Sequence, residues 1–397
     1  MAGEVAGRDA VVIPTGYDPG SYSCVRSLGD RGVRTVVASE YDNVPAAASR
    51  FCDESVVIPS PHDDVVDYKD ALLDLAARPA VRTVLPLRAQ DPYVFARYYD
   101  EFDEHVDLVT PPLETLEQVH DRLDLYAAAT AAGVPVPETR PLRDGTDRGC
   151  DVIVKSRYNV LTDRYLDTIS PRSAETVKEF NHLRADEPVD ASAIQNRMNH
   201  EPIAQEFVES DGEYLFGALY DRGDAVATFQ HEQIRGDSYI GGGGVFRKSI
   251  YDPALEEVGE TLLDSLDWHG LACIEYLRDA DTGEYKLVEV NPRLWQSLPC
   301  AVRAGADFPY YYWLLATGRG TDVVDSYETG VGTHLLYGEL GYLRSILRDE
   351  SPFFERPSVL GETLAVLRSC VTSPYFDNLR VDDPRPFLRG FRHVVFG

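Results

Sequence analysis

Short apolar runs alternate with helix-like periodic segments over the first quarter of the chain. Residues 11–15 and 35–38 are apolar runs of strand length, and between them Cys24, Val25 and Leu28 share one face of a helix over 21–31. A strand, a helix and a second strand in this order predict the start of a parallel α/β sheet. The same patterns predict further strands at 55–58, 83–87 and 106–109, and helices over 66–77 and 92–101.

The pattern changes after the Pro111-Pro112 pair, which predicts a domain boundary near residue 112. A helical stretch over 113–132 ends at the turn that starts at Gly133, and strand-like runs then predominate. Four glycines at 241–244 predict a flexible loop or one with special backbone angles. The tail, 325–397, has no pattern that we can interpret. Between these segments we predict strands at 151–155, 202–208, 213–220, 224–230, 271–277 and 285–290, and helices over 174–183 and 255–266.

The net charge of the chain limits which partners it can bind. The 397 residues include 66 acidic and 38 basic side chains, giving a formal net charge of −28, and the acidic residues are spread along the whole chain. Such a field repels nucleic acids and anionic membranes, so we expect neither as a partner. Only five of the basic residues are Lys. This composition resembles that of proteins from salt-accumulating halophiles, which we favour over an acidic protein from a GC-rich mesophile.

No apolar run reaches the roughly 20 residues that a membrane helix needs. The first nine residues have neither a basic segment nor a long apolar one, so we expect no signal peptide and a cytoplasmic location. The six Cys are scattered without a Cys-x-x-Cys motif, which favours neither a disulfide framework nor a zinc site.

Three oxygen-bearing side chains lie in two neighbouring apolar strands. Glu275 lies in the first predicted strand, and Glu289 and Asn291 lie in the second, two residues apart and therefore on one face. A carboxylate among aliphatic side chains is costly unless a cation or a donor meets it. Two carboxylates and an amide oxygen suit Mg²⁺ that is held together with substrate phosphates. The alternative is two unrelated carboxylates on an exposed hairpin.

Glu275 followed by Glu289-Val-Asn291-Pro-Arg293 resembles the metal-binding pattern of the ATP-grasp superfamily, and the resemblance extends from about residue 9 to residue 320. It implies an α/β fold: an N-terminal parallel α/β domain over 1–112 and an ATP-grasp domain over 113–324. The α+β lobes of the second domain would clamp ATP, with a small central lobe at about 150–210. Residues 325–397 are then a C-terminal extension of unknown role.

Two cations of the chain match phosphate-binding positions of this superfamily. Asp121-Arg122 is similar to its Asp-Lys pair, with Arg122 in place of the usual Lys. Lys155, at the end of a predicted strand, is similar to the Lys that contacts the α and β phosphates. The alternative for Lys155 is an ordinary surface side chain at the end of a strand.

The segment from Gln205 to Val208 is similar to the hinge that holds adenine through main-chain groups, which here are those of Phe207 and Val208. The resemblance implies that Glu206 lies near the adenine amino group and that Glu213 binds the ribose hydroxyls. An ordinary strand with solvent-facing glutamates is the alternative.

Residues 291–297 and 304–309 look like those of a little-characterised group of carboxylate–amine ligases or carboligases. This narrower resemblance implies that Arg293 faces the γ-phosphate or an acyl phosphate, as a planar guanidinium can. The implied cofactors are ATP and Mg²⁺, with Mn²⁺ possible, and the implied substrates are a small-molecule carboxylate and an amine. An oligomer is also possible. The alternatives are a bicarbonate-activating carboxylase and a catalytically silent ATP-binding regulatory protein.

Two features depart from the superfamily pattern. Residues 156–170 contain no Gly, whereas many members have a glycine-rich loop soon after the second Lys. The later glycines at 241–244 form either a mobile phosphate or substrate loop or an ordinary long turn. Arg235, Arg247 and Lys248 flank them and either hold an anionic substrate or form solvated ion pairs.

Overall fold

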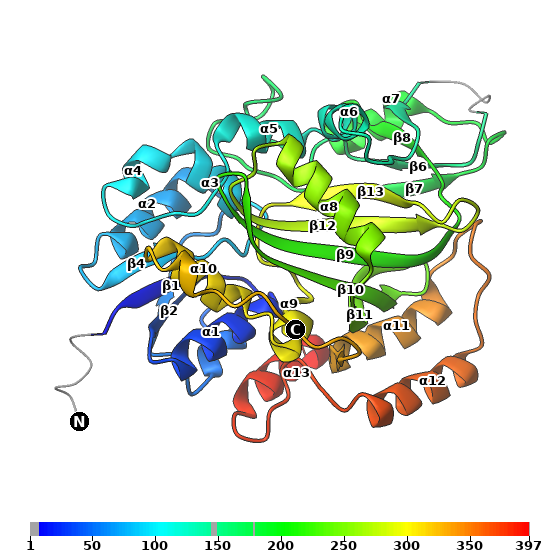
Figure 1. Cartoon of the computed structure of the whole chain (residues 1–397). Helices are drawn as coiled ribbons and strands as arrows, with labels where there is room; N and C mark the ends of the chain where they lie inside the picture. Colours follow the sequence, from blue (N-terminus) through cyan, green and yellow to red (C-terminus); the bar gives the residue numbers. More distant parts are fainter. Residues whose placement is uncertain (1–7, 144–148, 178, 397) are drawn as a thin grey trace.

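The N-terminal part of the chain forms a parallel sheet in the order β3-β2-β1-β4. The computed structural model describes residues 8–143, 149–177 and 179–396 (Figure 1). The predicted strand–helix–strand start is confirmed, since β1 and β2 pair in parallel and α1 connects them. The elements of this part are β1 (Ala10–Pro14), α1 (Gly20–Asp30), β2 (Arg34–Ser39), β3 (Glu54–Val57), α2 (Val65–Ala76), β4 (Val81–Val84), α3 (Asp91–Arg97) and α4 (Tyr99–Asp103).

Two predictions in this part are wrong. The residues at 106–109 form no strand: the Asp107 N–H donates to the Arg82 carbonyl at 3.1 Å, but the contact does not extend into a ladder. The helix predicted over 92–101 is divided into α3 and α4 at Tyr98. The stretch over 113–132 is likewise two helices, because Asp121 adopts an extended backbone and caps the second one with its carboxylate. They are α5 (Leu113–His120) and α6 (Arg122–Ala131).

A small antiparallel sheet follows, in the order β5-β8-β6-β7. The helix predicted over 174–183 is wrong, because residues 180–183 pair with β6 as a strand and tertiary pairing outweighs local propensity; Lys178 lies outside the described residues. The elements are β5 (Thr139–Pro141), β6 (Val152–Lys155), β7 (Phe180–Leu183), α7 (Ala191–Met198) and β8 (Ile203–Glu206).

The largest sheet has six strands in the order β13-β12-β9-β10-β11-β14, with α8 across it (Figure 1). The glycines at 241–244 do not form a loop but begin β11, pairing with the end of β10; Gly241 and Gly242 do have the predicted special backbone angles, with φ of 124° and 100°. The elements are β9 (Ser210–Asp221), β10 (Asp224–Ser238), β11 (Gly241–Ile250), α8 (Pro253–Ser265), β12 (Gly270–Asp279), β13 (Tyr285–Asn291), α9 (Leu298–Ala304) and α10 (Phe308–Ala316).

The C-terminal extension is part of this fold, because β14 (Gly332–His334) pairs with β11 and completes the six-stranded sheet. Two buried ion pairs hold the extension to the sheet. Arg247 contacts Asp377 at 2.7 Å, and Arg235 contacts Glu339 at 2.8 Å. These two arginines therefore anchor the extension and do not hold a substrate. The helices are α11 (Leu336–Arg348), α12 (Val359–Thr372) and α13 (Arg385–Phe396).

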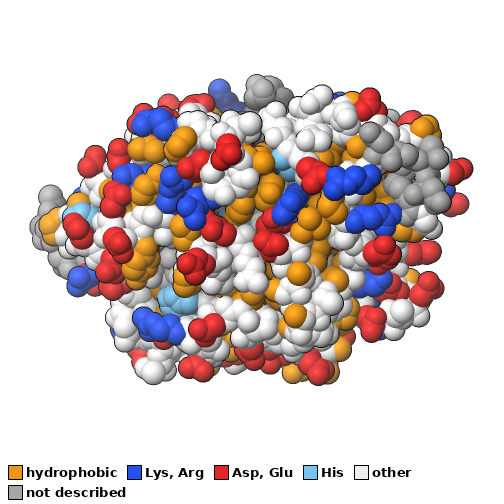
Figure 2. Space-filling view, turned by 90° about the horizontal axis from the view of Figure 1, so that it is seen from above, with side chains coloured by type: hydrophobic (Ala, Val, Ile, Leu, Met, Phe, Trp, Pro, Cys, Tyr) orange, Lys and Arg blue, Asp and Glu red, His pale blue; other side chains and the backbone are white. Residues whose placement is uncertain are grey.

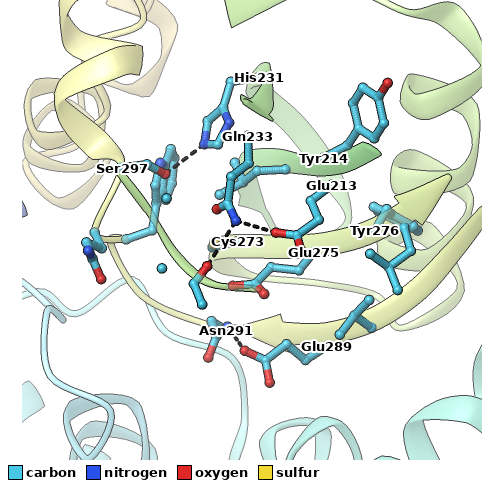
Figure 3. Close-up of a pocket in the computed structure, with 18 of the residues that line it drawn as sticks. Glu213, Tyr214, His231, Gln233, Cys273, Glu275, Tyr276, Glu289, Asn291 and Ser297 are labelled. Atoms are coloured by element: carbon cyan, nitrogen blue, oxygen red, sulfur yellow. Dashed lines mark hydrogen bonds between the residues drawn. The ribbon is translucent and has the colours of Figure 1, made fainter. Parts of the chain in front are cut away.

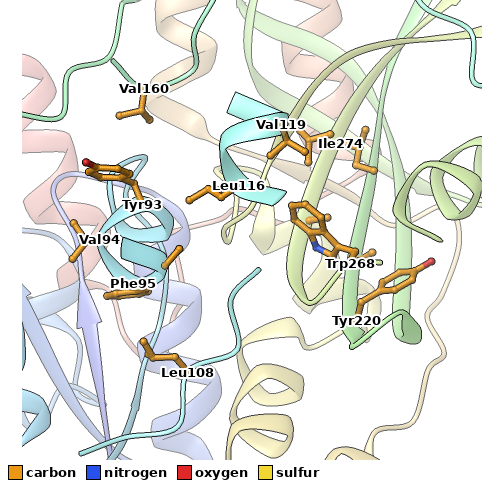
Figure 4. Close-up of a cluster of buried hydrophobic side chains, with 14 of the residues drawn as sticks. Tyr93, Val94, Phe95, Leu108, Leu116, Val119, Val160, Tyr220, Trp268 and Ile274 are labelled. Carbon is orange, nitrogen blue, oxygen red and sulfur yellow. The ribbon is translucent and has the colours of Figure 1, made fainter. Parts of the chain in front are cut away.

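One apolar core joins the N-terminal sheet to the six-stranded sheet. Leu116 and Val119 of α5 lie between the side chains around Phe95 and those around Ile274 and Trp268 (Figure 4). On the face seen in Figure 2, acidic side chains are scattered over the surface among Lys and Arg. Within the described residues, no helix is long and apolar enough to cross a membrane.

Candidate active site

A pocket of about 460 Å³ lies over one face of the six-stranded sheet (Figure 3). Side chains from paired strands form the floor of the pocket. Glu289 is opposite Glu275, and Glu275 is opposite Leu215 of β9. Leu215 is in turn opposite His231 of β10, so one row of side chains crosses four strands. Because side chains on a strand alternate between faces, residues two apart, such as Asn291, point into the same pocket.

The two carboxyl groups of this row, those of Glu275 and Glu289, have pKa values that are shifted in opposite directions. The enclosing protein and then the charge of Glu289 raise the pKa of Glu275, although its side chain is open to the cavity. Enclosure also acts to raise the pKa of Glu289, but Arg122, the Asn291 amide and Lys155 outweigh it and lower that pKa. Asn291 Nδ2 donates to Glu289 Oε1 at 2.7 Å, which leaves the Asn291 amide oxygen for another partner.

These three residues fit a hard divalent cation. They offer carboxylate and amide oxygens, the ligands that Mg²⁺ takes when substrate phosphates and water complete its shell. Across the part of the chain that the structure describes, no group of three or more His, Cys, Asp or Glu has metal-binding geometry. A cation here therefore depends on the Asn291 oxygen and on ligands from a nucleotide.

Two cations face the carboxylates, Arg122 from α6 and Lys155 from β6 of the small sheet. Arg122, the first residue of α6, forms a 2.7 Å ion pair with Glu289 and donates to the Ser156 carbonyl at 2.8 Å. Burial and the charge of Arg122 lower the pKa of Lys155 to about 7, while Glu289 and Glu275 act in the opposite direction. The structure thus brings Lys155 and Arg122 together with the carboxylates.

Glu213, the predicted ribose ligand, lines the same pocket from β9. It accepts a hydrogen bond from Gln233, whose amide also donates to the Gly242 carbonyl at 2.9 Å. Burial, and then Asp237, raise the pKa of Glu213 to about 7. A Cβ at Gly244 would lie 2.6 Å from the Gln233 side chain, so glycine here gives the pocket its width.

The predicted hinge lies between β8 and β9. The Phe207 N–H donates to the Asp151 carbonyl at 2.8 Å, so only the carbonyl of Phe207 is suited to meet a nucleotide. Val208 is buried. The Glu206 carboxylate is 2.8 Å from Lys286 Nζ of β13, and this ion pair connects the small sheet to the large one.

The C-terminal extension reaches this hinge, which the sequence did not indicate. The chain between α11 and α12 passes beside β7 (Figure 1), where Ser351 Oγ lies 3.0 Å from His182 Nδ1. The Phe353 ring packs on the Phe207 ring, with centroids 4.3 Å apart. The extension therefore forms part of the surroundings of the candidate adenine site.

Arg293 lies at the end of the pocket nearest the N-terminal sheet. Its charge acts to lower the pKa of Asp18, which burial raises. His231 also lines the pocket; its Nε2 is 2.7 Å from Ser297 Oγ (Figure 3), and burial lowers the pKa of His231 to about 3. No site role was predicted for His231 from the sequence. Its two-residue spacing from Gln233 on one strand was the signal that it lines the pocket.

Solved structures share this fold over most of the chain. The biotin carboxylase domain of 2-oxoglutarate carboxylase from Hydrogenobacter thermophilus, solved with MgADP, ADP and bicarbonate, has a TM-score of 0.59 and 14% identity, covering 81% of this chain and 73% of that one. N5-carboxyaminoimidazole synthetase from Staphylococcus aureus, complexed with ADP, has a TM-score of 0.56 and 15% identity, covering 82% and 80%. An L-amino acid ligase from Bacillus licheniformis has a TM-score of 0.52 and 14% identity, covering 78% and 74%.

These similarities confirm the expected ATP-grasp fold, with its parallel N-terminal sheet and its two antiparallel sheets. At 14–15% identity they establish the fold and do not assign residues. No protein-family model and no curated protein sequence matches the chain.

Proposed function

We propose that this protein is an ATP- and Mg²⁺-dependent ligase that joins a carboxylate to an amine. One observation carries the proposal: Glu275, Glu289 and Asn291 line one pocket, and Arg122 at the start of α6 pairs with Glu289. Proteins of this fold whose structures were solved with MgADP, and an L-amino acid ligase of the same fold, support it. We also propose the domain boundaries that the sequence predicted, near residues 112 and 324.

The chemistry runs in two steps. A carboxylate oxygen of the substrate attacks the γ-phosphorus of ATP, and the bond to the β–γ bridging oxygen breaks to release ADP. The amine nitrogen then attacks the acyl carbon, and inorganic phosphate leaves as the amide forms and the nitrogen loses a proton. No protein nucleophile is required, so the protein contributes positioning and charge neutralisation.

Each residue has a proposed part in these steps. Glu275, Glu289 and Asn291 hold Mg²⁺, which would neutralise charge on the β and γ phosphates. Lys155 and Arg122 hold phosphate oxygens, and Arg293 meets the charge that develops on the transferred group. The Phe207 carbonyl and the Val208 amide hold adenine beside Glu206, while Glu213 accepts hydrogen bonds from the ribose hydroxyls.

The test is ATP-dependent release of ADP and phosphate with a panel of carboxylic acids and amines, with products identified by mass spectrometry. An amide product that forms only with both substrates supports the proposal. Turnover with bicarbonate alone would instead indicate the carboxylase activity that the bicarbonate-bound neighbour suggests. ATP binding without turnover on any acid, amine or bicarbonate would indicate a regulatory protein.

We further propose that the protein works in the cytoplasm at molar salt. The net charge of −28 and the five Lys support this setting, since counterions at about 1 M reduce the Debye length to about 3 Å. Unfolding temperatures in 0.2 M and 2 M KCl test the salt requirement: an equal or lower value at 2 M contradicts it.

A further inference from the structure

A second cavity, of about 280 Å³, lies between α9, β14 and the chain segment 374–382. None of the residues that line it lines the candidate active-site pocket. Arg303, near the end of α9, and Arg380, in the segment before α13, both face this cavity. It is therefore a separate feature of the fold, and the ligase proposal gives it no role.

These two arginines differ from most others on this acidic chain. Arg88, for example, pairs with Glu40 through two hydrogen bonds of 2.6 Å. Among the described residues, neither Arg303 nor Arg380 has a carboxylate partner. Arg303 stacks on the Tyr375 ring, 3.8 Å from its centroid, and the Arg380 Nε is buried without a hydrogen-bond partner.

The carboxylates of the cavity are engaged elsewhere. Asp377 is paired with the buried Arg247 at 2.7 Å, and Asp382 is paired with Arg26 at 2.7 Å and with Arg50 at 3.1 Å. Burial, and then the charges of Arg303 and Arg26, lower the pKa of Arg380, although Tyr22 and Asp382 act in the opposite direction. Because both aspartates of the lining pair with arginines outside it, the two arginines of the lining have no carboxylate partner in the part of the chain that the structure describes, in a protein that carries 28 more acidic than basic residues.

Two half-buried like charges that are in no ion pair repel each other, and a bound anion removes that cost. Guanidinium groups match the oxygens of phosphate in bidentate geometry, and phosphate carries nearly two negative charges at neutral pH. We propose that Arg303 and Arg380 form a phosphate-binding site for inorganic phosphate or a small phosphate monoester. A volume of about 280 Å³ holds either one.

The experiment is calorimetric titration of the full chain, without ATP or Mg²⁺ and at constant ionic strength in KCl. The probes are inorganic phosphate, glycerol 2-phosphate and, for comparison, acetate. The background is Arg293→Gln, which removes a phosphate contact proposed for the active site. We expect one phosphate per chain, and we expect the double variant Arg303→Gln/Arg380→Gln in this background to bind about tenfold more weakly or worse. Comparison of the two phosphate probes distinguishes free phosphate from a monoester as the better ligand.

Arg319→Gln is the matched control, because Arg319 pairs with Asp322 at 2.7 Å on the surface. Made in the Arg293→Gln background, this control should bind phosphate as tightly as the Arg293→Gln chain does. Removing two unpaired arginines should not lower the unfolding temperature in phosphate-free buffer below that of this control. The proposal is wrong if neither phosphate probe binds, if the double variant binds as tightly as its background, or if acetate binds equally well. A specific loss of stability in the double variant would also contradict it, since that would indicate a structural role.

Discussion

Arg122 Nη2 and Glu289 Oε2 lie 2.7 Å apart and join the start of α6 to the strand β13. The pair is mostly buried, with side-chain exposures of 11% and 22%. It connects the helix that follows the N-terminal domain with a proposed metal ligand. A nucleotide that attracts Arg122 would therefore act on Glu289 as well.

The first prediction concerns this pair. Arg122→Met should lower the free energy of unfolding by about 2 kcal/mol, because it leaves a carboxylate without its partner in a largely buried place. Arg122→Met/Glu289→Gln should recover about half of that loss, and Arg122→Lys should keep most of the stability. Urea unfolding of five chains measures this coupling: the wild type, Arg122→Met, Glu289→Gln, the double variant and Arg122→Lys. Strictly additive single effects would mean that the pair does not interact.

Lys155→Met should raise the Kd for ATP by about tenfold to a hundredfold, since a charged hydrogen bond to phosphate contributes about 1.5–3 kcal/mol. The free protein should not be destabilised, because burial already lowers the pKa of Lys155 to about 7. Lys248→Met, which removes an exposed lysine from β11, is the control. Equal ATP affinity in both variants contradicts the phosphate role of Lys155.

Phe353→Ala should raise the KM for ATP severalfold and leave kcat nearly unchanged, because the ring supports Phe207 at the hinge. An aromatic pair of this kind contributes about 0.5–1.5 kcal/mol. Leu360→Ala, at an exposed position of α12, is the control. Unaltered KM in Phe353→Ala would mean that the extension has no part in nucleotide binding.

Acid should destabilise the protein through two buried histidines. Burial lowers the pKa of both His120 and His231 to about 3, below the ordinary value of 6.5. Between about pH 3 and pH 6.5 the unfolded chain therefore binds more protons than the folded chain, and the free energy of unfolding falls as the pH decreases from about 6.5 to about 3. Each histidine accounts for about 2 kcal/mol between pH 7 and pH 5. His120→Gln should reduce the measured loss by that amount, and an identical pH dependence in the variant contradicts the assignment.

The parts of the site that follow strand periodicity were predictable from sequence. Alternation places Glu289 and Asn291 on one face, and the apolar neighbours of Glu275 indicate a strand beside them. Contacts between distant segments were not predictable. Ser297 meets His231 across 66 residues, and no local pattern brings Phe353 to Phe207.

The glycine-rich segment at 241–244 shows why composition wrongly predicted a loop there. Four glycines indicate conformational freedom, but here they also provide space inside a strand. A Cβ at Gly243 would lie 2.8 Å from the Gln296 side chain, which lines the pocket. The segment at 180–183 was misread for a related reason, because its pairing with β6 depends on a partner more than twenty residues away.

The central claim is that Glu275 and Glu289 hold Mg²⁺ against the phosphates of a bound nucleotide. Calorimetric titration with ADP, with and without Mg²⁺, on the wild-type chain, Glu275→Gln and Glu289→Gln tests it most directly. We predict that Mg²⁺ tightens ADP binding to the wild-type chain at least tenfold, and that either variant loses this effect but keeps Mg²⁺-free ADP binding. Absence of ADP binding to the wild-type chain, or an undiminished Mg²⁺ effect in both variants, would contradict the account.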